Sequence, residues 1–214
     1  GNNNGNADEL PEHEVCLSSF KMDKYEVTQS AFQASMDRNP SKFVGANLPF
    51  ERVNWMGADD YCRKKGKRLP TEAQWEYAAR GGTKTEFYFG DKYVETGGNF
   101  CDSLCSNEES RNPKFTDGFP STSPVGSFPP NPYGLYDMAG NVSEWVEDWF
   151  EANYYLVSPK KNPQGPPPSM YKVARGGSWL NSLEYLHSSR RAYLWPEFRV
   201  ESQGFRSVLN AEKN

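Results

Sequence analysis

The chain has 214 residues, of which 36% are hydrophobic and 14% aromatic, and its formal net charge is -4. A mean hydropathy of -0.85 argues against a membrane-spanning protein, and the aromatic content argues against a disordered one. The acidic balance argues against a nucleic-acid-binding protein, which normally needs a basic surface. The 18 glycines and 16 prolines predict a loop-rich fold with little regular structure.

Short helices are predicted in the first third of the chain, after a polar leader. Residues 1–11 begin with a run of Gly and Asn, which predicts a flexible tether before a single domain over 12–214. Residues 15–25 predict a strand and its turn. Thr28 suits the N-cap of a helix that ends at Met36, and a second helix fits residues 56–65.

The clearest helix signal follows Pro70. Thr71 and Gln74 form a capping box, and Gly81 with Gly82 stops the helix. From Thr83 onward, Gly, Pro and Asn interrupt short aromatic segments, and the helix signal disappears. We find no internal repeat and no change of composition that would divide the chain into two domains.

Histidine and cysteine limit the metal chemistry. The histidines are His13 and His187, so a three-His zinc site is excluded, and a two-His iron site would need both of them. The cysteines at positions 16, 62, 101 and 105 allow two disulfides or four free thiols. Cys101 and Cys105 could close a small loop, which would leave Cys16 and Cys62 as the remaining pair.

Several motifs occur in a fixed order, at residues 22–28, 66–82, 124–131, 133–142, 175–179 and 204–206. Together they resemble the formylglycine-generating-enzyme-like (sulfatase-modifying factor) family over about residues 12–209. The resemblance implies an α+β domain of C-type-lectin-like fold, loop-rich, with a small antiparallel sheet and a few short helices.

The resemblance also implies structural calcium, which accepts oxygen ligands in loose geometry. One implied site uses the side chains of Asn99 and Asp117 and the carbonyls of Phe100 and Phe119. The other uses the side chains of Asp137 and Glu144 and the carbonyls of Gly140 and Val142.

The family's named chemistry depends on copper held by two cysteine thiolates after the Gly-Gly-Ser-aromatic motif, and thiolates suit Cu(I). Here the two matching positions are Asn181 and Leu186. The related iron-dependent, sulfur-transferring branch needs a histidine triad, which two histidines cannot supply. We therefore expect the chain not to be an enzyme.

Residues 180–203 have apolar positions that fit neither a strand nor a helix period. The segment is similar to the variable region of proteins diversified by retroelements, in which randomised positions alternate with scaffold residues. The scaffold here is 175–179, 188–189, Arg191, 196–197, Arg199 and 204–206. The positions that this resemblance implies are variable are Leu180, Asn181, Ser182, Leu183, Tyr185, His187, Arg190, Ala192, Tyr193, Leu194, Trp195, Phe198, Val200, Glu201 and Ser202.

We expect Tyr185, Tyr193, Leu194, Trp195 and Phe198 to be partly exposed on one face, framed by two buried scaffold aromatics, Trp179 and Phe205. Such variable proteins resemble bacterial surface lipoproteins. The resemblance implies a monomeric binder at the cell surface or outer membrane, attached through an N-terminal lipid anchor, with an unknown protein or cell-surface ligand. The alternatives are a non-catalytic envelope lipoprotein, a maturation accessory protein of the family, or a divergent enzyme.

Overall fold

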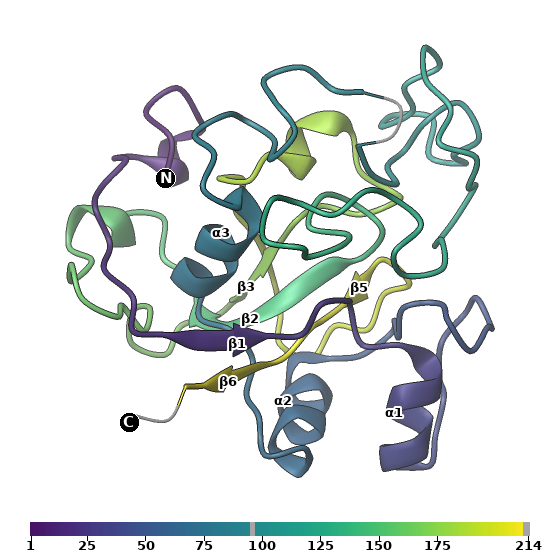
Figure 1. The fold of residues 1–214 in the computed structure, drawn as a ribbon, viewed down its shortest axis with the longest axis horizontal. Coiled ribbons are helices and arrows are strands. Elements are labelled where there is room, and N and C mark those ends of the chain that lie inside the picture. Colours follow the sequence, from purple (N-terminus) through teal and green to yellow (C-terminus); the bar gives the residue numbers. More distant parts are fainter. Residues whose placement is uncertain (95–96, 212–214) are drawn as a thin grey trace.

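The structure is a computed structural model that describes residues 1–94 and 97–211 (Figure 1). The end of the expected domain, residues 212–214, lies outside the described residues. The helices are α1 (Gln29–Met36), α2 (Trp55–Lys64) and α3 (Glu72–Arg80), with 3-10 turns η1 (Ala7–Glu9), η2 (Tyr154–Leu156) and η3 (Leu183–Leu186). The strands are β1 (Phe20–Met22), β2 (Ser143–Trp149), β3 (Lys172–Arg175), β4 (Ala192–Leu194), β5 (Gln203–Gly204) and β6 (Val208–Asn210).

Each α-helix begins where a polar side chain caps it. The side chains of Thr28, Asn54 and Thr71 accept hydrogen bonds from the backbone N–H groups three residues later. The capping box of Thr71 with Gln74 is present, so the predicted third helix is confirmed. The second helix begins at Trp55, one residue earlier than predicted, because Asn54 is its cap.

Four strands form the central sheet in the order β4-β3-β2-β5, and β1 pairs with β6 in a separate two-stranded sheet. All pairs are antiparallel except β2 with β5, which is parallel. The small sheet is thus antiparallel, as expected, apart from the two-residue parallel pairing of β2 with β5. β4 lies at one edge of the sheet, and its three residues are exposed or partly exposed.

The central sheet separates two hydrophobic clusters. On one face, Trp145 and Ala174 pack with Phe32 of α1 and Tyr61 of α2. On the other face, Val146 and Val173 pack with Trp75 and two alanines of α3. In Figure 1, α1 and α2 accordingly lie on one side of the sheet and α3 on the other.

Residues 1–11 do not form the expected flexible tether. They turn back on themselves, with the N–H of Asn2 donating to the carbonyl of Glu9 (3.1 Å). Arg80 of α3 donates to the carbonyl of Gly1 (3.1 Å), and Arg191 donates to the carbonyl of Asp8 (2.9 Å). The sequence of residues 1–11 does not indicate this packing, because the two arginines bind backbone carbonyls, which every residue has. Across residues 1–94 and 97–211, no helix is long and apolar enough to cross a membrane.

Candidate functional site

The segment 180–203 links two buried aromatic anchors. Trp179 is 4% exposed, and its indole N–H donates to the carbonyl of Glu201 (3.2 Å). Phe205 is 1% exposed and packs edge-to-face against Tyr61, with ring centroids 5.4 Å apart. Both anchors are as buried as predicted, so the ends of the segment are held by the core while the chain between them follows the surface.

Two fully buried arginines hold the middle of the segment. Arg175 of β3 donates to the carbonyls of Ser188 (3.0 Å) and Ser189 (2.7 Å). Arg191 forms a two-pronged ion pair with Glu72 at the start of α3 (2.8 and 3.0 Å). Burial of a guanidinium requires partners for its charge, and these contacts supply most of them, so they hold the backbone at residues 188–191.

The scaffold and candidate variable positions of the segment differ in burial, largely as the sequence pattern predicts. All fifteen candidate variable positions are exposed or partly exposed. The scaffold residues 175–179, 188–189, Arg191 and 204–206 are all buried, whereas Pro196, Glu197 and Arg199 at the turn after β4 are not. The predicted partial exposure of Tyr185, Tyr193, Leu194, Trp195 and Phe198 is confirmed.

The prediction that these five side chains share one face is wrong. Leu194 packs against the cluster on the α1 and α2 side of the sheet, whereas Tyr193, its neighbour in β4, stacks on Phe150 with ring centroids 4.1 Å apart. Successive side chains of a strand point to opposite faces. Tyr185 lies apart from both, in η3, beneath the guanidinium of Arg190 (4.7 Å from the ring centroid).

Two aromatic residues outside the segment extend the surface around β4. The ring of Tyr171 lies 5.2 Å from that of Tyr193 and 4.8 Å from that of Trp195. Phe150, just after β2, forms the stack with Tyr193 described above. The sequence analysis missed Tyr171 and Phe150, because only the pairing of β3 with β4 brings them beside the segment.

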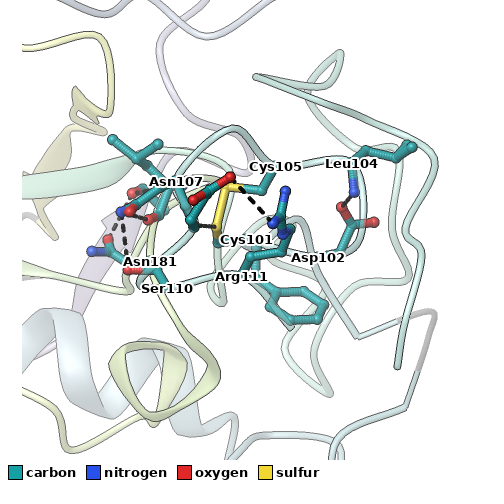
Figure 2. The surroundings of a disulfide bond; sticks show 12 residues. Cys101, Asp102, Leu104, Cys105, Asn107, Ser110, Arg111 and Asn181 are labelled. Carbon is teal, nitrogen blue, oxygen red and sulfur yellow. Dashed lines mark hydrogen bonds and ion pairs between the residues drawn. A yellow bond between two sulfur atoms is a disulfide. The ribbon is translucent and has the colours of Figure 1, made fainter. Parts of the chain in front are cut away.

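A disulfide-closed loop supports the first residues of the segment (Figure 2). Cys101 and Cys105 are bonded, as the sequence allowed. The N–H of Cys101 donates to the carbonyl of Asn181 (2.9 Å), and the side chain of Asn107 donates to the carbonyl of Leu180 (3.4 Å). These bonds fix the backbone at two candidate variable positions and leave the side chain of Leu180 free to change.

The remaining cysteine pair does not form in the described chain. Cys16 is exposed, whereas Cys62 lies in the core on α2, and both are free. Burial raises the pKa of the Cys62 thiol to about 12, so Cys62 is not a reactive thiolate at neutral pH.

The two positions that carry the copper-binding cysteines in the family hold no thiol. The amide oxygen of Asn181 accepts a hydrogen bond from the hydroxyl of Ser178 (2.7 Å). Leu186 is 1% exposed and belongs to the cluster beneath α3. Asn181 therefore stabilises the turn after β3, and Leu186 fills the core.

The first implied calcium site has an oxygen donor set that fits a hard cation. The amide oxygen of Asn99 is buried and has no hydrogen-bond partner among the described residues. Asp117 accepts from the N–H groups of Phe100 (3.0 Å) and Phe119 (2.8 Å), and burial raises its pKa to about 6. An unpaired buried amide oxygen and a carboxylate bonded to the next residue along the chain are the kinds of ligand that calcium takes.

The second implied site fits less well, because Glu144 is already occupied. Its two oxygens accept from Arg206 (2.7 to 3.0 Å) and from the indole N–H of Trp75 (2.8 Å). Asp137 retains one buried oxygen without a partner in the described chain. In the structure Glu144 is the partner of a buried arginine, and its role as a calcium ligand stays a prediction. Among residues 1–94 and 97–211, no group of three or more His, Cys, Asp and Glu side chains is arranged to hold a metal ion.

Glu26 is a buried acid near this site that the sequence analysis did not single out. It accepts from the side chain of Asn141 (2.6 Å) and from the N–H of Val142 (3.0 Å). Burial, reinforced by Asp137 and Glu144, raises its pKa well above the ordinary value. The hydrogen bonds tie the β1–α1 connection to the loop before β2.

Comparisons with known proteins agree with this architecture. The family described as sulfatase-modifying factor enzyme 1-like domain matches residues 1–211. The chain is 41% identical to the formylglycine-generating enzyme of Streptomyces coelicolor over 78% of this chain and 54% of that protein. It is 35% identical to serine/threonine-protein kinase pkn1 of Chlamydia caviae over 96% of this chain and 35% of that protein.

An inactive member of the family is also similar, since the inactive C-alpha-formylglycine-generating enzyme 2 of Bos taurus is 35% identical over 77% of the chain and 51% of that protein. The chain thus spans about a third to a half of the length of these relatives. Among solved structures, Treponema denticola variable protein 1 superposes with a TM-score of 0.81 at 28% identity, covering 92% of this chain and 86% of that one. The chain belongs to the sulfatase-modifying factor family, whose similar members include enzymes and an inactive protein, and it has the C-type-lectin-like fold of the Treponema variable protein.

Proposed function

We propose that this protein is a non-catalytic ligand-binding protein whose binding surface is the segment 180–203, diversified by a retroelement. One observation carries the proposal: the positions that the sequence pattern marks as variable are accessible, and most of those that it marks as scaffold are buried. Every position expected to vary is at least partly accessible, and the scaffold outside the turn after β4 is buried. The likeness to Treponema denticola variable protein 1 supports the same interpretation.

The energetics of the fold support diversification at these positions. Substitutions of exposed residues usually change the free energy of unfolding by less than about 0.5 kcal/mol. The backbone of the segment is held by Arg175, Arg191 and the loop closed by the Cys101–Cys105 disulfide, none of which needs a particular side chain at the fifteen positions. The segment can therefore accept many sequences on one backbone.

The side chains now present suit a binding surface. Tyr193 is 49% exposed, Trp195 40% and Phe198 48%. Tyr and Trp offer a large contact area at a low cost in conformational entropy, and they often dominate the binding energy of an interface.

Sequencing of the genomic neighbourhood tests the diversification directly. We expect a reverse-transcriptase gene and a template copy of the 3′ end of the coding sequence beside it. Substitutions between the two copies should fall at template adenines within the fifteen positions. Trp195 and Glu201 cannot arise from an AAC asparagine codon by adenine changes alone, so their template codons must differ. Substitutions concentrated at Arg175, Arg191 or Trp179 would contradict the proposal.

The alternative of an enzyme is tested by activity. The chain should be incubated with copper and a peptide that carries the sulfatase cysteine motif, with the Streptomyces coelicolor enzyme as a positive control. Because Asn181 and Leu186 supply no thiolate, we expect the peptide cysteine to remain unchanged. Conversion to the aldehyde would refute the non-catalytic assignment and favour the divergent enzyme.

We further propose display at the bacterial cell surface or outer membrane through an N-terminal lipid anchor on the full gene product. The ligand would be a protein or another cell-surface molecule rather than a nucleic acid, and the chain would act as a monomer. Protease treatment of intact cells that express the full gene should remove the protein, whereas a cytoplasmic marker should survive. Protection equal to that of the marker would exclude surface display, which would leave an intracellular maturation accessory protein as the alternative.

Calcium is the proposed structural cofactor, held at Asn99 and Asp117. The unpaired buried amide oxygen of Asn99 is the observation that favours this site. When bound, the ion would neutralise the carboxylate of Asp117 and connect the loops that surround residues 99 and 117.

A further inference from the structure

One edge of β1 is open. Along the other edge, Asp23 donates its N–H to the carbonyl of Ser207 (2.9 Å). Lys21 lies opposite Leu209 in the register, and Met22 opposite Val208. The N–H and C=O groups of Val208 bond to the backbone of Arg68 and not to that of Met22. The N–H and C=O groups of the odd-numbered residues of β1 therefore point toward β6.

Backbone groups alternate in direction along a strand. The N–H and C=O groups of Phe20 and Met22 therefore point away from β6, and within residues 1–94 and 97–211 they have no backbone partner. Figure 1 shows β6 along one side of β1 and α3 beyond the other side.

The beginning of this open edge is already used by the chain itself. Cys16 donates its N–H to the carbonyl of Lys160 (2.7 Å) and accepts from the N–H of Asn162 (2.9 Å). The next N–H on this side, that of Ser18, donates to the side chain of Asn162 (2.7 Å). Asn162 has a φ of +47°, and there the segment turns away. An extended chain could continue this pairing past Asn162, along Phe20 and Met22.

A groove runs beside the open edge. Its volume is about 590 Å³, and its walls are residues 15 and 17–22 on one side and Tyr77, Ala78, Tyr133 and Leu135 on the other. Tyr77 is 53% exposed and Tyr133 49%, and their rings lie 5.7 Å apart. The walls are therefore mainly apolar and aromatic, and they are open to solvent.

The charge at this groove is positive, although the net charge of the chain is -4. Lys21 lines the groove, and none of the lining residues is Asp or Glu. Lys161, beside the point where the existing pairing ends, is exposed. Neither lysine has an ion-pair partner in the described part of the chain. The groove thus complements a partner with acidic residues at the ends of an apolar stretch.

We propose that this groove binds an extended segment of a partner protein as a third strand beside β1. The main chain of the partner would pair with Phe20 and Met22, its alternate apolar side chains would lie against Tyr77 and Tyr133, and its acidic ends would approach Lys21 and Lys161. Strand addition of this kind takes affinity from main-chain hydrogen bonds and specificity from pockets for alternate side chains.

The test uses the synthetic peptide Glu-Val-Thr-Val-Thr-Val-Glu with blocked termini, titrated into the whole chain and followed by NMR. We expect the amide signals of Phe20 and Met22 to shift and to become protected from hydrogen exchange. Two control peptides are matched to it, one N-methylated on alternate residues and one with Lys in place of Glu. The first cannot donate its main-chain hydrogen bonds along one edge, and the second reverses the charge, so both should bind at least about tenfold more weakly.

Variants of the chain complete the test. Tyr77→Ala and Tyr133→Ala should each weaken binding of the first peptide about tenfold, as loss of an aromatic contact does at an interface. Tyr193→Ala removes an equally exposed tyrosine from the proposed variable surface and should leave binding unchanged. The inference is overturned if the peptide does not bind, if N-methylation has no effect, or if the signals that shift belong to residues 180–203. Each of these outcomes leaves the proposed function at 180–203 standing.

Discussion

Two tryptophans of the same segment provide a matched test of how the fold separates scaffold from surface. Trp179 is 4% exposed, donates its indole N–H to the carbonyl of Glu201 and lies edge-to-face with Phe43, with ring centroids 5.4 Å apart. Trp195 is 40% exposed, and Tyr171 is its aromatic neighbour, 4.8 Å away between ring centroids. Replacement by Ala removes the same atoms at both positions, so any difference in stability reflects the surroundings.

The two substitutions should lower the free energy of unfolding by amounts that differ several-fold. Trp179→Ala leaves a cavity and should lower the free energy of unfolding by about 3–5 kcal/mol. Trp195→Ala removes one aromatic contact and a partly buried side chain, which should lower the free energy of unfolding by about 1 kcal/mol. For a chain of this size 1 kcal/mol changes Tm by roughly 2–4 °C, so Trp179→Ala should melt roughly 10 °C below the parent and Trp195→Ala within about 4 °C of it.

Thermal melting followed by circular dichroism, together with urea unfolding at constant temperature, measures both costs. Phe205→Ala and Tyr193→Ala form a second pair, 1% and 49% exposed, and should rank in the same order. If Trp195→Ala were as destabilising as Trp179→Ala, residues around β4 would belong to the core, and the reasoning that places a binding surface there would fail.

Three further predictions concern buried polar groups. Arg206→Met leaves the carboxylate of Glu144 buried without its partner, so urea unfolding should show a loss of about 3–5 kcal/mol; a loss below about 1 kcal/mol would contradict the buried pair. Burial raises the pKa of Glu51 from 4.5 to about 7; the folded state therefore binds more protons than the unfolded state between these values, and this contribution to stability should fall as pH rises from 4.5 to 7. Glu51→Gln should flatten the slope of unfolding free energy against pH over that window, and an unchanged slope would refute the shift. Removal of calcium with EGTA should lower Tm of the parent but not of Asn99→Ala or Asp117→Asn, and an unchanged parent Tm would exclude a structural role for calcium.

Local structure could be predicted where a few neighbouring residues decide it. The capping box of Thr71 and Gln74 and the glycine at position 81 define α3 within one segment of sequence. The Cys101–Cys105 bond closes a loop of adjacent residues, and its possibility was visible for the same reason. The alternation of scaffold and variable positions in 180–203 could be identified because it is a pattern along the chain.

Contacts between distant segments could not be predicted in this way. The partner of Arg206 is Glu144, and that of Arg191 is Glu72, although each of these acids could serve as a metal ligand or a surface charge on sequence grounds. The polar residues 1–11 were predicted to be a tether, because the sequence does not show that Arg80 and Arg191 bind their carbonyls.

The amino-acid sequence by itself determined the family, the three helices and the positions that reach the surface between Trp179 and Phe205. Only the tertiary structure decided that β4 pairs with β3 at the edge of the sheet, which brings Tyr171 and Phe150 beside Tyr193. The physical reason is that helix caps and tight loops depend on hydrogen bonds between near neighbours. The place of a strand in a sheet, and the partner of a buried charge, depend on which distant segments pack together.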